Sequence, residues 1–156
     1  MSHWLMKSEP DEFSIDDLAR APGKTTPWFG VRNYLARNYM RDAMRVGDGV
    51  LFYHSSCAVP GIAGIAKVAS GPHPDESQFD AKSPYHDPKS ARENPRWVLV
   101  DVKLVKKTRL LSLEELRGRE ELSDMVVLRR GNRLSITPVT PGEWAIVNRL
   151  LARDAG

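Results

Sequence analysis

The chain has 156 residues, and its 23 Lys and Arg against 20 Asp and Glu give a formal net charge of only +3. Hydrophobic residues make up 41% and charged residues 28%, a composition typical of folded globular proteins that excludes a disordered chain. No apolar run approaches the roughly 18 residues of a membrane span, and the start lacks the features of a secretory signal. The length predicts a single domain over residues 1–156, and the charge is too mild to indicate a polybasic arm.

Cys57 is the only cysteine, which excludes disulfides within the chain and zinc sites built from several cysteines. A reducing, cytoplasmic compartment is therefore expected. The phosphate-binding, dinucleotide-binding, serine-hydrolase and zinc-protease motifs are all missing from the sequence. His73 and His86 lie in one proline-rich segment with several aspartates, but ordinary solvent-exposed histidines explain them better than a metal site. We expect no catalytic residues, no metal and no cofactor.

Three segments carry the signature of a capped helix N-terminus. In each, a hydroxyl residue is followed three positions later by an acid: Ser14 and Asp17, Ser112 and Glu115, Thr140 and Glu143. The hydroxyl can accept a hydrogen bond from the third amide, while the acid accepts one from the amide of the cap. The sequence therefore predicts a helix directly after each of these caps.

A fourth helix is predicted over residues 34–45. Its apolar residues recur at helical spacing and form one face: Leu35, Ala36, Tyr39, Met40, Ala43 and Met44. The residues at positions 33, 37, 41 and 45 follow an i, i+4 spacing and predict a polar stripe on the opposite face.

Strand-like runs occupy residues 3–7, 49–55, 62–70 and 97–105. In the last run Val98, Val100, Val102 and Leu104 alternate on one face. A final pair near 126–128 and 134–137 brackets a hairpin-like turn at 129–132. Because strands and helices do not alternate regularly, a doubly wound parallel sheet is disfavoured. We predict an α+β fold with a mixed, mostly antiparallel sheet curled into a small barrel with peripheral helices.

The segment of residues 71–97 holds five of the eleven prolines. Prolines at that density predict an irregular loop, at about 71–96, without regular elements. A loop of this length in a compact domain is either functional or mobile. Because it keeps Phe79, Tyr85 and Trp97, a packed functional loop is the favoured interpretation.

The sequence Trp28-Phe29-Gly30-Val31-Arg32-Asn33-Tyr34 combines aromatic, guanidinium and amide groups beside a predicted helix start. Trp28 can stack on a flat ring, and Arg32 and Asn33 carry the donors and acceptors that read base edges or carboxylates. The alternative is that Trp28 belongs to the core and Asn33 only caps the helix, and the local pattern leaves both open.

At these residues the chain resembles the EVE domain family. The matching segments follow in order: 4–10, 28–34, 36–38, 47–48, 52–55, 61–66, Tyr85, 95–97, 134–135, 137–140 and 143–144. The resemblance implies a PUA-like β pseudo-barrel with helices at its edges. It also implies a non-enzymatic reader of a modified nucleobase, chiefly modified cytosine in DNA, with a modified RNA base as a further option. The implied partner is therefore a nucleic acid and not a membrane, and a monomer is slightly favoured.

The resemblance also implies a set of ligand-binding residues: Lys7, Ser8, Glu9, Trp28, Val31, Arg32, Asn33, Arg37, Ser55, Tyr85, Trp97 and Ser135. Trp28 is expected to stack on the base or line its slot, and hydrogen bonds to the base edge are expected from Glu9, Asn33 and Ser55. Arg32 and Arg37 are expected to meet a phosphate or to hold the pocket walls. Leu35 replaces a glutamine common in the family, with little expected effect if it lies on the apolar helix face.

Two alternatives remain open from the sequence. One is a small hydrolase acting on a modified nucleoside, in which Lys7, Glu9 and His54 would transfer protons. The other is an interaction module of a stress or defence system that uses the proline-rich loop as its surface. Nothing in the residues themselves distinguishes DNA, RNA or a free nucleotide as the ligand.

Overall fold

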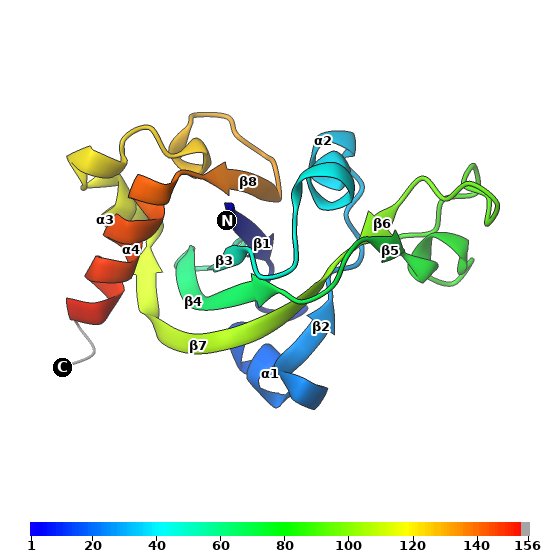
Figure 1. Ribbon diagram of the computed structural model, residues 1–156, viewed down its shortest axis with the longest axis horizontal. Helices are drawn as coiled ribbons and strands as arrows, with labels where there is room; N and C mark the ends of the chain where they lie inside the picture. Colours follow the sequence, from blue (N-terminus) through cyan, green and yellow to red (C-terminus); the bar gives the residue numbers. More distant parts are fainter. Residues whose placement is uncertain (154–156) are drawn as a thin grey trace.

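A six-stranded sheet dominates the computed structural model, which describes residues 1–153 (Figure 1). Its strand order is β2-β7-β4-β3-β1-β8. The strands are β1 (His3–Ser8), β2 (Thr25–Pro27), β3 (Gly49–His54), β4 (Gly61–Val68), β7 (Asp101–Ser112) and β8 (Ile136–Val139). Only the β1–β3 pair is parallel, and the other pairs of neighbours are antiparallel. The prediction of an α+β fold with a mixed, mostly antiparallel sheet is confirmed.

The predicted closure of the sheet into a barrel is wrong. β2 and β8 lie at opposite edges, and no pairing joins them within residues 1–153. These edge strands have three and four residues, so each offers few backbone groups for closing a barrel. The curvature lies instead in the twelve-residue β7, which Figure 1 shows as a long bent strand beside β4. Its pairing with β4 shifts register twice.

The sheet buries both of its faces. Along β1, Trp4 and Met6 pack into one hydrophobic cluster and Leu5 into the other, as the alternation of a strand requires. The central β3 is buried from Gly49 to Tyr53. The first cluster includes residues of the helices after β1 and before β3, and the second includes residues of the two C-terminal helices.

The three predicted helix starts are confirmed. The helices are α1 (Ile15–Arg20), α3 (Leu113–Arg117) and α4 (Pro141–Arg153). The Ser14 hydroxyl accepts the Asp17 amide at 3.1 Å, while the Asp17 carboxylate accepts the Ser14 amide at 2.8 Å. Thr140 and Glu143 form the same reciprocal pair, and the hydroxyl of Ser112 caps α3. Within residues 1–153, no helix combines the length and the hydropathy needed to cross a membrane.

The predicted helix over residues 34–45 is α-helical only in its first half. α2 (Tyr34–Asn38) continues as a π-helical turn, η2 (Tyr39–Ala43). A π turn holds more residues than an α turn, so the positions that face the sheet shift along the segment. Ala36 and Met40 are buried, but Leu35 is 46% exposed. Its predicted place on the apolar face is therefore wrong.

The predicted hairpin at 126–137 is also wrong. Residues Val126–Leu128 form a 3₁₀ turn, η5, and Ile136–Val139 pairs as β8 with β1 instead. Val127 is buried in the second hydrophobic cluster, so the apolar residues serve helical packing and not a strand. Two further 3₁₀ turns are η1 (Pro22–Lys24) and η4 (Glu120–Leu122).

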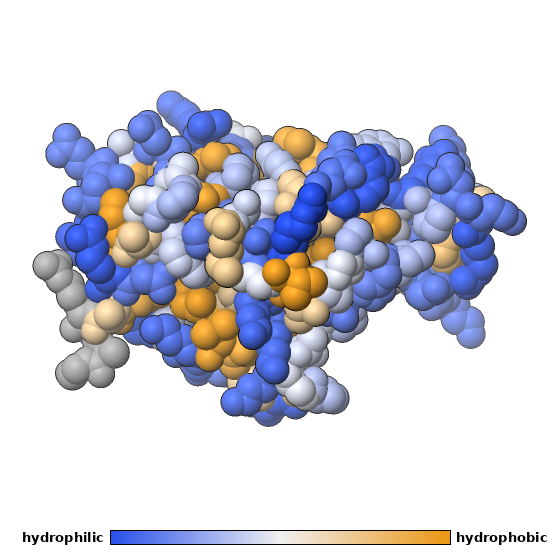
Figure 2. Space-filling model, viewed as in Figure 1, coloured by the Kyte–Doolittle hydropathy of each residue, from blue (hydrophilic) through white to orange (hydrophobic). Residues whose placement is uncertain are grey.

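The proline-rich loop contains short regular elements, contrary to prediction. β5 (His73–Pro74) pairs with β6 (Val98–Leu99), and the 3₁₀ turn η3 (Glu76–Phe79) follows β5. The loop projects from the sheet as a separate lobe, whose visible surface is largely hydrophilic (Figures 1 and 2). The predicted strand over 97–105 is split at Val100, because β6 pairs with β5 in a separate two-stranded sheet while β7 belongs to the six-stranded sheet.

Gly61 provides a test of the β4–β7 contact. A Cβ at this position would lie 2.7 Å from the Ser112 Cα and closer still to the Leu111 carbonyl oxygen. We expect Gly61→Ala to lower the free energy of unfolding by about 1–3 kcal/mol in denaturant titration, because the strands must separate. Gly71→Ala is the control, since no atom lies within 4 Å of its added Cβ. Equal losses in the two variants would contradict this packing.

Candidate functional site

A cavity of about 780 Å³ lies beside the carboxyl ends of β1 and β3. These two strands are parallel neighbours, so their carboxyl ends lie side by side at the same end of the sheet. Beyond that edge the Ser55 amide donates to the Ser8 carbonyl at 3.0 Å. The Lys7 amide donates to the Ser135 carbonyl at 2.8 Å, which attaches the segment that enters β8. Backbone pairing therefore brings three distant segments to one wall of the cavity.

Most residues predicted to bind a ligand line this cavity. They are Lys7, Ser8, Glu9, Trp28, Val31, Arg32, Ser55, Tyr85 and Ser135. They come from β1 and its following loop, the β2–α2 connection, the end of β3, the proline-rich loop and the entry to β8. Their placement in one cavity is a structural finding, and their contact with a ligand stays a prediction.

Asn33 and Arg37 do not belong to the lining. The Asn33 side chain is the N-cap of α2 and accepts the Ala36 amide at 3.1 Å. This is the structural alternative that the sequence left open. The Arg37 guanidinium donates to the Asn38 side chain at 2.8 Å and to the Arg96 carbonyl at 3.0 Å. Both residues hold the α2 region together.

Trp97 is also placed outside the lining. It is buried, and its indole nitrogen donates to the Asp87 carboxylate at 2.8 Å. One face stacks on the Tyr34 ring, with the ring centroids 4.9 Å apart. Trp97 therefore ties the proline-rich loop to α2.

Several lining residues were not identified from the sequence. They are Glu12, Phe13, Thr26, Pro27, Phe29, Gly30, Ser56, Ser83, Pro84 and Arg133. Phe29 and Gly30 lie within the aromatic segment 28–34, between the predicted site residues Trp28 and Val31. Their position next to these residues was a signal that could have identified them. Glu12 and Ser83 carry no local signal, because only the folding of two distant loops brings them together.

Trp28 serves both the core and the cavity. Its side chain is 7% exposed and packs edge-on against Phe52, with centroids 5.5 Å apart. It also belongs to the lining. The two readings of Trp28 left open by the sequence are therefore compatible, with the indole forming a wall whose other side is core.

A buried carboxylate joins the β2–α2 connection to the proline-rich loop. Asp75 Oδ2 accepts the Gly30 amide at 2.7 Å and Arg32 Nη1 at 3.2 Å, while Oδ1 accepts the Ser77 amide at 2.9 Å. The Asp75 side chain is 1% exposed. Charge-assisted hydrogen bonds of this kind are strong in a buried setting, so Asp75 fixes the relative position of two cavity walls.

Arg32 is engaged within the protein. Its guanidinium has five donors, and five hydrogen bonds bind them to the side chains of Asp75 and Ser77 and the carbonyls of Val31 and Tyr85. Of the two roles expected for Arg32, holding the pocket wall is the one that this geometry supplies.

The Tyr85 ring covers Gly30. A Cβ on Gly30 would lie 2.9 Å from the ring, and the φ of +84° at Gly30 is one that glycine adopts readily. Phe29 packs edge-on against the same ring, with centroids 5.7 Å apart. The Tyr85 hydroxyl donates to Glu12 across the cavity at 3.4 Å, and burial, followed by the nearby Glu12 charge, raises the pKa of Tyr85.

Lys7 and His54 both lie in settings that disfavour their charged forms. Burial lowers the pKa of Lys7 and, as its main cause, that of His54. His54 Nε2 accepts the Ile15 amide at 3.1 Å, so this nitrogen holds α1 and is not free to act as a base. Within residues 1–153, no group of three or more His, Cys, Asp or Glu is placed to hold a metal ion.

Comparison with known proteins gives consistent matches over nearly the whole chain. The EVE domain matches residues 2–150. Thymocyte nuclear protein 1 of Homo sapiens is 44% identical, over 98% of this chain and 75% of the relative. A structure from Leishmania major is 47% identical with a TM-score of 0.93, covering 100% of this chain and 98% of that one. Human THYN1 in complex with DNA containing 5-methylcytosine is 43% identical with a TM-score of 0.91, covering 96% and 97% of the two chains.

Removing the Asp75 charge is expected to loosen the cavity. Asp75→Asn leaves Arg32 without its ion-pair partner, and we expect a loss of about 2 kcal/mol in the free energy of unfolding. Hydrogen exchange at the Gly30 and Ser77 amides should accelerate. Glu76→Gln is the control, because the Glu76 side chain is 70% exposed in its pair with Arg92. Unchanged hydrogen exchange in Asp75→Asn would contradict the role of Asp75 in joining the β2–α2 connection to the proline-rich loop.

Stability should fall as the pH drops below neutrality. The folded-state pKa of His54 lies below the ordinary 6.5, so the unfolded chain takes up its proton first as the pH falls. Stability from His54 is thus complete above 6.5 and is lost as the pH falls through 6.5 toward the folded pKa. The half-buried His3, whose pKa is also lowered by burial, acts in the same direction. Urea titrations between pH 7.5 and 5.5 (roughly the histidine range) give the free energy of unfolding at each pH. We expect this free energy to change less with pH in His54→Gln than in wild type. The exposed His86→Gln is the control, and equal slopes in both variants would exclude His54 as the cause.

Proposed function

The chain belongs to the EVE domain family, and we propose that it binds DNA carrying a modified cytosine, with the modified base enclosed in the cavity beside β1 and β3. The observation that carries the proposal is the cavity itself, in a chain that matches human THYN1, solved with 5-methylcytosine-containing DNA, over 96% of its length. A base can enter such a cavity only when it leaves the helical stack, as in proteins that flip their target nucleotide.

The aromatic lining suits a flat ring. Trp28, Phe29 and Tyr85 line the cavity from two segments that lie far apart in the sequence. Stacking of a base on an aromatic side chain contributes about 1–3 kcal/mol and does not depend strongly on the base. These residues therefore supply affinity for a base but little discrimination between bases.

Discrimination is assigned to the polar and apolar groups around the rings. Glu9 and Glu12 line the cavity, and carboxylates accept hydrogen bonds from the exocyclic amino group of cytosine. Val31 and Pro27 offer apolar surface, which suits a methyl group on the base. The combination favours an amino-bearing base with a small apolar substituent.

The cavity is not built primarily for phosphate. The five donors of Arg32 are bound within the protein. The other two cationic residues of the lining, Lys7 and Arg133, share it with the two carboxylates of Glu9 and Glu12. We therefore assign the DNA backbone to the rim and the outer surface, and the base to the interior.

Tyr85→Ala tests the assignment. The variant removes the ring but keeps the Tyr85 carbonyl that binds Arg32. We expect wild type to prefer an oligonucleotide with one 5-methylcytosine over its unmodified counterpart. Tyr85→Ala should bind the modified oligonucleotide about tenfold more weakly in fluorescence anisotropy at a fixed salt concentration, through lost stacking.

Tyr34→Ala is the matched control. Tyr34 is 52% exposed and stacks on Trp97 outside the cavity lining, so its removal should leave the preference intact. Equal losses in the Tyr34 and Tyr85 variants would contradict the cavity assignment. Equal binding of the two oligonucleotides by wild type would contradict the reading of the modification. An RNA oligonucleotide with the same modified base determines which polymer is preferred.

A further inference from the structure

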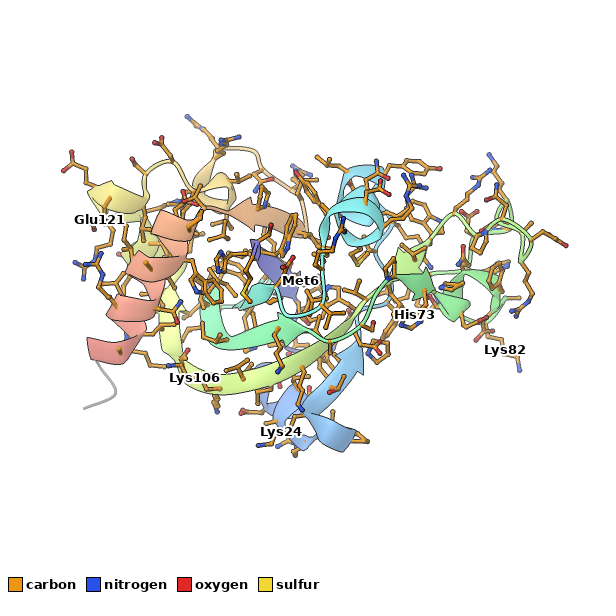
Figure 3. All side chains as sticks on the ribbon, viewed as in Figure 1. Met6, Lys24, His73, Lys82, Lys106 and Glu121 are labelled. Atoms are coloured by element: carbon orange, nitrogen blue, oxygen red, sulfur yellow. The ribbon has the colours of Figure 1, made fainter. Side chains whose placement is uncertain are left out.

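Lys7 differs from the other lysines of the chain. The chain has eight lysines, and the seven others are exposed: Lys24, Lys67, Lys82, Lys89, Lys103, Lys106 and Lys107. Lys24, Lys82 and Lys106 lie at the periphery of the molecule (Figure 3). Lys7 is half-buried and is the single lysine that lines the cavity.

The backbone of Lys7 is held firmly. It lies in β1 opposite Tyr53 of the parallel neighbour β3, and its amide donates to the Ser135 carbonyl at 2.8 Å. The Lys7 Nζ atom lies 6.0 Å from the centroid of the Tyr53 ring. A side chain that starts from a paired strand has a more precise position than one on a mobile loop.

The Lys7 amine is not neutralised by a nearby acid. Among residues 1–153, no carboxylate forms an ion pair or hydrogen bond with Lys7 Nζ. Lys107, by contrast, pairs with Asp16 at 2.6 Å. Burial lowers the pKa of Lys7, which increases the fraction of neutral amine at neutral pH. A neutral amine is the nucleophilic form that adds to carbonyl compounds.

We propose that Lys7 captures nucleobases that bear an aldehyde, such as 5-formylcytosine, by forming a reversible imine inside the cavity. The proposal rests on the base-binding function proposed above and adds a covalent step to it. Lys7 is one of the residues that line the cavity. An aldehyde on an enclosed base therefore lies in the same cavity to which Lys7 contributes.

The step balances without a further reactant. The Lys7 nitrogen adds to the aldehyde carbon, and the carbonyl electron pair moves to oxygen, which takes a proton to give a carbinolamine. Loss of the hydroxyl group together with the remaining nitrogen-bound proton forms the C=N bond and releases one water molecule. Nothing is oxidised or reduced, and hydrolysis returns the lysine and the aldehyde. Glu9 and Glu12, in the same lining, are available to carry the protons.

Borohydride trapping tests the proposal. The full chain is incubated with an oligonucleotide that contains one 5-formylcytosine, and sodium borohydride then reduces any imine to a stable amine. We expect a covalent protein–DNA adduct, with peptide mass spectrometry placing it on Lys7 of the wild-type chain. Lys7→Arg keeps the positive charge but cannot form the imine, so it should lose the adduct. The exposed Lys67→Arg should retain it.

A parallel arm separates this proposal from the proposed function. Binding to the 5-methylcytosine oligonucleotide is measured without reductant, where no imine can form. Binding without an adduct, or an adduct on a lysine other than Lys7, would overturn the imine while leaving the base-binding function standing. Failure to bind either modified oligonucleotide would overturn both. Because the adduct is mapped on wild type, the result does not depend on the folding of a variant.

Discussion

The carboxylate of Asp75 is the interaction on which the cavity depends. Asp75 belongs to the proline-rich loop, where it accepts the Ser77 amide, and it also binds Gly30 and Arg32 of the distant β2–α2 connection. A charge with a 1% exposed side chain would be costly alone, and the guanidinium and amide donors around it offset that cost. Because Arg32 also holds the Tyr85 carbonyl, one carboxylate fixes the wall that places an aromatic ring over Gly30.

The walls of the cavity have two different origins. Lys7, Ser8 and Ser55 stand on or next to β1 and β3, so strand pairing sets their positions. Tyr85 comes from the projecting lobe, and its position depends on side-chain contacts of Arg32 and Asp75 (Figure 1). Rotamers locked by packing and hydrogen bonds are what a precise binding site needs from a loop. Arg32 holds the Tyr85 side of the cavity in place, because all five of its donors are bound within the protein.

The sequence predicts those features that local chemistry decides. The caps at Ser14 and Thr140 follow from hydrogen bonds within four residues, and the sides of β1 follow from alternation. Pairing of β8 with β1, and not with residues 126–128, depends on segments more than a hundred residues apart. Glu12, which lines the cavity, and Asn33, which lies outside the lining, illustrate the same limit of sequence-based prediction. Glu12 reaches the cavity only through tertiary folding, while Asn33 has a strong local role as a cap that the sequence could not separate from binding.

The mild net charge of +3 is consistent with the electrostatics of the cavity. Lys7 and Arg133 share the lining with Glu9 and Glu12, and Arg32 is balanced by Asp75. A phosphate entering this space would approach two carboxylates as well as two cations, so it would gain little from the Coulomb interaction. A neutral base can use both kinds of group, because carboxylates accept from its amino group and cations donate to its ring nitrogen and carbonyl oxygen. Under the proposed function, this balance of charges favours the base of a nucleotide over its phosphate, and a strongly basic surface is not required for that preference.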